Sequence, residues 1–112
     1  RDSNYHYIEG NSDITIDGHH KIFINKSASI NNNYDIQVGA GANLNIQVDT
    51  GDVNIHTIRG KINMNAGGDY NLKVGGNYTL SVDGSHSETI AGTRTESVTG
   101  DNTKTGKTIN LN

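Results

Sequence analysis

The sequence between residues 60 and 100 reads GKINMNAGGDYNLKVGGNYTLSVDGSHSETIAGTRTESVTG. A glycine recurs in it every eight residues, at Gly60, Gly68, Gly76, Gly84, Gly92 and Gly100. The residue two positions before each of these glycines is isoleucine, valine or alanine, and apolar residues alternate with polar ones in between. A period of eight that contains a period of two predicts short strands joined by tight corners and stacked in a regular column. We expect the corner glycines to supply backbone conformations that a side chain would penalise.

The chain is poor in the residues that build a core. Of its 112 residues, 31% are hydrophobic, one is phenylalanine and none is tryptophan, which is too little for an ordinary globular interior. Such a composition is often disordered, yet a disordered sequence has no reason to keep its apolar residues in phase. Order combined with so small a core predicts an oligomer in which several chains share one interior.

Three further features of composition narrow the class of protein. The absence of proline suits uninterrupted strand ladders. Cysteine is absent as well, so neither disulfides nor thiolate metal sites hold the chain together. The net charge of -3 does not favour a nucleic-acid partner, which would favour a basic stripe.

The octad pattern is looser in the first half of the chain. Residues 1–26 form a loose octad β segment, in which Gly10 and Gly18 stand eight positions apart. Residues 27–59 keep the alternation but lose the glycine marker, and their apolar residues slip in phase. We expect an irregular β segment there, with a bulge or a longer corner. The candidate corners are Gly39-Ala40-Gly41, Asp49-Thr50-Gly51 and Asn31-Asn32-Asn33.

The regular octads occupy residues 60–112. Ile109 and Leu111 reverse the parity of the apolar residues, which predicts a terminal cap strand rather than another stacked layer.

One octad is too short to enclose an interior, because eight residues supply only one strand and one corner. Three chains that each contribute one side per level close a triangular prism in which every strand edge is paired. The sequence therefore predicts an all-β fold, an intertwined trimeric triple-stranded β-helix (β-prism) built from octad repeats with a less regular middle. The expected inward-facing core is Ile58, Ile62, Met64, Leu72, Val74, Leu80, Val82, Ile90 and Val98.

A Val-x-Gly unit repeats in register along the chain. Its copies are Val74-x-Gly76, Val82-x-Gly84, Ile90-x-Gly92 and Val98-x-Gly100, with variants that end at Gly10, Gly18, Gly60 and Gly68. These octads resemble those of the central spike of contractile-tailed phages. The valine-glycine-repeat spike proteins of type VI secretion share the pattern. The resemblance implies a C-terminal triple-stranded β-helix.

The resemblance also implies a role. It implies a rigid, non-catalytic needle of the phage tail baseplate, a cell-puncturing device that crosses the host outer membrane when the sheath contracts. It places the chain in the virion at the tip of the baseplate, or in a bacterial secretion apparatus if the chain is a type VI spike tip. The chain begins at Arg1 rather than methionine, which we interpret as a fragment or a processed product.

The implied partners are two further copies of the chain and the upstream hub domains of the baseplate. The resemblance also implies a transient contact with the host outer membrane. A small repeat protein that caps the tip is a further implied partner, and the expected docking residues for it are Ile109, Leu111 and Asn112. No nucleic acid is implied.

In the last octads the inward positions become polar. They are occupied by His86, Glu88, Arg94, Glu96 and Lys104. If these side chains face the axis, the trimer contains rings of charge that hold ions or water and fix the register of the chains, since unpaired buried charges are costly. If the strands widen or turn there, the same side chains are solvated. His86 is the one candidate for a metal site, as a ring of three histidines on the axis; otherwise no cofactor is expected.

Two other classes of function stay open. A trimeric fibre or adhesin stalk that binds glycans would need an exposed aromatic platform. An enzyme on a single-chain β-solenoid, such as a polysaccharide lyase, would need longer rungs and clustered charges on one face. The acidic residues form no convincing acid–base pair, so we expect no catalytic residues and no enzyme.

Overall fold

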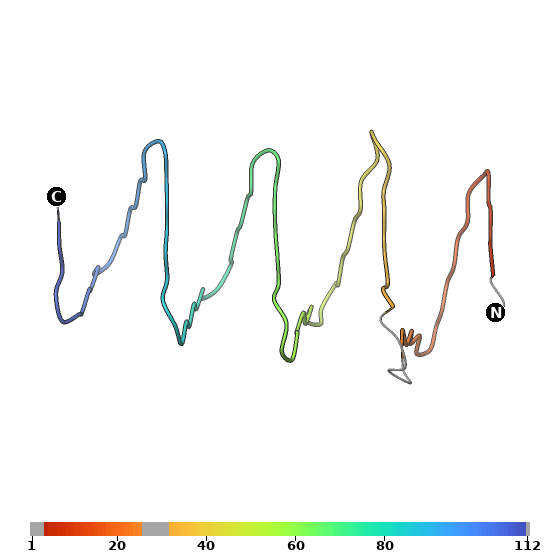
Figure 1. Ribbon diagram of the computed structural model, residues 1–112, viewed down its shortest axis with the longest axis horizontal. Coiled ribbons are helices and arrows are strands. Elements are labelled where there is room, and N and C mark those ends of the chain that lie inside the picture. The colour runs from red at the N-terminus through yellow and green to blue at the C-terminus, as the bar shows by residue number, and fades with distance from the viewer. Residues whose placement is uncertain (1–3, 26–31, 112) are drawn as a thin grey trace. The chain divides into compact units, whose positions relative to one another are not determined.

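The computed structural model describes residues 4–25 and 32–111, and within them it contains neither a helix nor a hydrogen-bonded strand. The chain runs as extended segments joined by bends (Figure 1). It divides into two units, Arg1–Arg59 and Gly60–Asn112, of which the second begins at the first glycine of the regular octads. Asn112 and the expected zone boundary at residue 26 lie outside the described residues.

In the second unit the bends follow the octad. They lie at residues 67–68, 75–76, 83–84, 91–92 and 99–100, and six extended residues separate each bend from the next. Every one of these bends ends on an octad glycine. No two described residues twelve or more positions apart have Cα atoms within 8 Å, and the described segments form no hydrogen-bonded strand ladder with one another.

The start of the first unit has the same spacing, with bends at residues 9–10 and 17–18. The next bend ends at Asn25, whose φ of 59° lies in the left-handed region. Asparagine tolerates this conformation better than other non-glycine residues, because its short polar side chain can hydrogen-bond locally. The Nδ2 group of Asn32 donates a hydrogen bond to Oδ1 of Asn25 at 3.3 Å.

The middle of the chain contains a hydrogen-bonded turn at residues 39–42. The backbone N–H of Ala42 donates to the carbonyl oxygen of Gly39 at 3.3 Å, and Gly41 has a φ of 79°. A positive φ at the third residue is the mark of a type II turn, which favours glycine there. A second change of direction spans residues 49–51, where Nε2 of Gln47 donates to Oδ1 of Asp49 at 2.9 Å. Two of the three candidate corners are thus places where the chain turns. At the third, Asn32 and Asn33 lie in no bend, and Asn31 lies outside the described residues.

The described chain has no core of its own, because none of its described residues is buried. In the octads that end at Gly76 and Gly84, the side chain directly before the bend is the least exposed of the large apolar ones. Val74, Val82, Ile90 and Val98 are 42% to 46% exposed, whereas Leu72 and Leu80 are 60% and 59% exposed. Each bend therefore shields part of the side chain that precedes it, and the rest needs another surface to leave water.

Candidate functional site

The candidate functional feature is the column of octads between residues 60 and 107, rather than a pocket. Successive side chains of an extended segment point to opposite sides, so the even-numbered residues of these octads share one face. We call this the even face, and the opposite side the odd face. Between residues 62 and 82 the even face has no charged residue. Besides two corner glycines and one alanine, it contains Ile62, Met64, Tyr70, Leu72, Val74, Tyr78, Leu80 and Val82.

All of these even-face side chains are exposed in the single chain. Ile58, the first predicted core residue, is the most exposed of the predicted core set at 85%. Large contiguous apolar patches are rare on soluble monomers and mark surfaces that another molecule covers. Whether these residues face a shared interior stays a prediction, since it depends on further copies of the chain.

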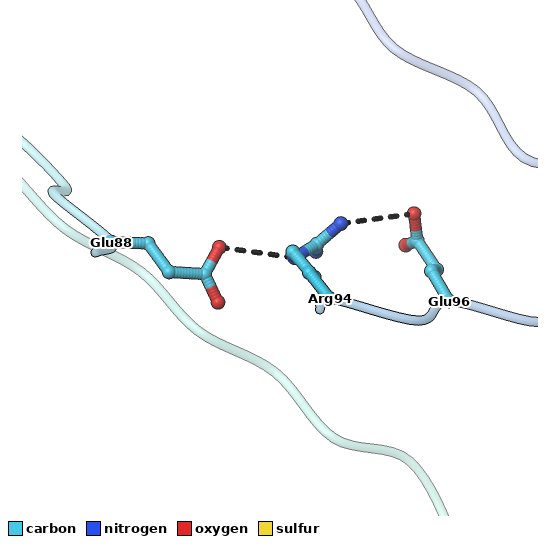
Figure 2. A network of polar contacts seen from close by, with 3 residues as sticks. All are labelled: Glu88, Arg94 and Glu96. Carbon is cyan, nitrogen blue, oxygen red and sulfur yellow. Dashed lines mark ion pairs between the residues drawn. The ribbon is translucent and has the colours of Figure 1, made fainter. Parts of the chain in front are cut away.

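Beyond residue 84 the even face carries charge. Figure 2 shows Arg94 between Glu88 and Glu96. Its Nε lies 3.2 Å from Oε1 of Glu88, and its Nη1 lies 3.6 Å from Oε1 of Glu96. The bend at residues 91–92 brings the first two residues together, while Arg94 and Glu96 are neighbours on the same side of one extended segment.

This charged cluster, Glu88–Arg94–Glu96, has two carboxylates for one guanidinium and a net charge of -1. Its side chains are about half exposed, from 41% to 52%. Ion pairs this accessible contribute about 0.2–1 kcal/mol each, because water and salt screen them. In the single chain the cluster therefore adds little stability.

The other two predicted polar residues are not joined to the cluster. Among the described residues, no ion pair links His86 or Lys104 to Glu88, Arg94 or Glu96. No group of three or more histidine, cysteine or acidic side chains in the described part of the chain is placed to hold a metal ion. A ring of three His86 side chains would require three copies, so that site stays a prediction.

The octad glycines of the single chain have no positive φ, and the backbone role that we expected for them stays a prediction. Among the described residues, Gly41 is the one glycine with a positive φ, so the bends of the octads do not use the left-handed backbone. A Cβ added at Gly68, Gly76 or Gly84 would meet no atom within 4 Å, and the same holds for Gly10, Gly18, Gly92 and Gly100. Within the single chain, no described atom excludes a side chain at these corners.

At the C-terminal end the chain bends at Lys107, after which Ile109 and Leu111 are exposed. Asn112, the third expected docking residue, lies outside the described residues. None of the described residues belongs to a helix long and apolar enough to cross a membrane.

The odd face of the charged octads has a composition that we did not predict. Between residues 85 and 99 every odd-numbered residue is serine, threonine or alanine, so histidine and all charged residues of this stretch lie on the even face. Sorting the sequence by parity would have revealed it. We also did not predict a cation–π contact, in which the Nζ atom of Lys21 lies 5.2 Å from the centre of the Phe23 ring. The contact depends on side-chain conformation, and the only hint of it in the sequence is that the two residues are two positions apart.

Comparison with known proteins identifies the octads. Residues 68–91 match the family model of the Gp5 C-terminal repeat, with three copies. Three copies in this span correspond to one copy per eight residues, which is the period of the glycines and of the bends. The predicted resemblance to the β-helix of a phage spike protein is thus confirmed over these residues, and the chain carries the repeat of a phage tail spike-type structural protein. No curated protein and no solved structure matches the chain.

Proposed function

We propose that three copies of this chain intertwine into a triple-stranded β-helix that forms the rigid needle of a contractile phage tail and pierces the outer membrane of the host. The observation that supports this proposal is the uncovered apolar face of a chain that bends every eight residues. Two further copies would supply the surface that the single chain lacks.

Backbone hydrogen bonding supports the same assembly. The described extended segments form no strand ladder with one another, although backbone N–H and C=O groups need partners when they leave water. Segments from two other copies on either side of each segment would complete the ladders and leave no free edge. Each even-face aliphatic side chain that becomes fully buried then contributes about 1.5–3 kcal/mol.

The proposed action of the needle is mechanical. Chains that wind around one another cannot separate without unfolding, which gives the stiffness that piercing requires. The role needs no catalytic residue and no cofactor. In the assembled spike the N-terminal end joins the hub domains of the baseplate, and the C-terminal end points toward the membrane and receives a cap protein.

The assembly is tested by the solution mass of the purified chain, measured by light scattering, and by its migration in SDS without heating. We expect three times the 12.0 kDa chain mass and a band that withstands the detergent until it is boiled. A monomeric mass would remove the shared interior, and the single-chain solenoid with its enzymatic and glycan-binding alternatives would replace the needle.

The piercing step is then tested on particles that carry the chain. Contraction on host cells should admit a hydrophobic dye that the intact outer membrane excludes. Particles whose chain cannot trimerise should adsorb equally well but admit none. Equal dye entry with both kinds of particle would contradict a piercing role, and a specific signal on a glycan array would favour the adhesin-type stalk.

A further inference from the structure

We infer that the charged cluster Glu88–Arg94–Glu96 sets the register in which three copies of the chain align, and that Lys104 of a neighbouring copy completes it. The inference rests on the proposed trimer. It concerns how the copies are aligned, which is a separate question from whether they associate.

The apolar octads cannot specify the register by themselves. Between residues 61 and 82 each octad places an apolar residue at the second, fourth and sixth positions after its glycine, with the same spacing of bends. A copy displaced by eight residues would again place apolar side chains against apolar side chains. Register is weakly specified wherever a shifted pairing buries an equivalent face.

The charged octads differ from one another, and their differences lie on the even face. Between residues 85 and 99 the odd face contains only serine, threonine and alanine. The two ion pairs of Arg94 join side chains of the even face (Figure 2). Ile90 and Val98 occupy the same face, so the cluster lies among the aliphatic residues that the copies would share. Polar groups inside an apolar interface are the best-attested devices for fixing register.

Charge complementarity identifies the missing partner. The cluster has a net charge of -1 in one chain, and Lys104, eight residues after Glu96 on the same face, supplies one positive charge. In a prism of octads, a segment of one copy lies beside the next octad of its neighbour, at the spacing of about 4.8 Å between strands. Glu96 of one copy then lies one strand spacing from Lys104 of another.

A displacement by one octad breaks this match in either direction. It places Glu96 beside Glu96 of the neighbour, or beside residue 112, which is an asparagine. In both cases a carboxylate in the shared interior loses its cation, which is costly in an environment of low dielectric constant. The native register is thus the one in which the charges balance.

The register can be measured because the chain contains no cysteine. A single Thr79→Cys substitution on the odd face, away from the charged cluster, accepts one nitroxide label per chain. Distances between labels are measured by double electron–electron resonance on the assembled protein. Three equivalent copies give one distance, whereas a trimer with one displaced copy gives at least two.

We expect one distance in the labelled parent and two or more in the Glu88→Gln/Arg94→Gln/Glu96→Gln variant, with the mass of a trimer in both. Lys104→Gln should also produce the additional distances, and it serves as the test if the triple variant does not assemble. The matched control is Lys73→Gln, which removes a charge from the odd face and should leave one distance. A single distance in trimers of Lys104→Gln would overturn the inference and leave the trimer standing. A parent that is not a trimer would overturn the proposed function itself.

Discussion

Two residues of the described chain hold a left-handed backbone, and both lie where the octad pattern is interrupted. Gly41 occupies the turn of the irregular middle, and Asn25 lies at a bend that precedes an octad position without glycine. The octad glycines themselves have no such conformation. Backbone freedom therefore matters at the two irregular corners, Asn25 and Gly41, and the regular corners of the single chain do not use it.

Gly41→Ala should destabilise the assembled protein by about 1–2 kcal/mol, because alanine pays the steric cost of a left-handed φ that glycine avoids. The midpoint of urea unfolding, followed by far-UV circular dichroism, measures the change.

Gly39→Ala is the matched control in the same turn. Gly39 has no positive φ, and a Cβ there would meet no atom within 4 Å. Equal effects of the two substitutions would show that the assembled protein does not retain the turn of the single chain.

The repeating structural unit of the regular part of the chain is the octad, which consists of six extended residues and a two-residue bend. Its period could be predicted because glycine spacing and apolar alternation are properties of neighbouring residues. The pairing of its strands depends on further copies, since the described segments of one chain form no strand ladder with one another. Alternation identifies a face, and only a neighbouring chain decides what covers that face.

Val82→Asp should prevent trimer assembly. The substitution removes about 1.5–3 kcal/mol of apolar burial per chain and adds a carboxylate without a partner to the shared interior. Size-exclusion chromatography with light scattering detects the loss of the trimer.

Ser81→Asp adds the same charge one residue earlier, on the odd face, and should assemble as the parent does. If Val82→Asp assembled and melted like Ser81→Asp, the assignment of the even face to the interior would be wrong.

At the scale of the whole molecule, a chain without a single buried described residue has little to gain by folding alone. In the proposed trimer its stability comes from association, as in obligate oligomers that have no stable folded subunit. A glycan-binding stalk would depend on association in the same way. The absence of buried residues among those described therefore bears on the assembly and not on the piercing role.

Refolding from denaturant should therefore accelerate as the chain concentration rises, because native β structure forms only when copies meet. The measurement is the half-time of the far-UV circular dichroism signal over a hundredfold range of concentration. A half-time independent of concentration would indicate that the chain folds before it associates.

The sequence by itself determined the period of eight, the parity of the apolar and charged residues, and the resemblance that the Gp5 C-terminal repeat confirms over residues 68–91. These are local properties, readable from the order of neighbouring residues. Only the tertiary structure decided which corners need a left-handed backbone, and that Arg94 bridges Glu88 and Glu96 across a bend. The reason is that a backbone angle and a side-chain contact depend on the path of the chain through the bend, which the pattern of residue types does not specify.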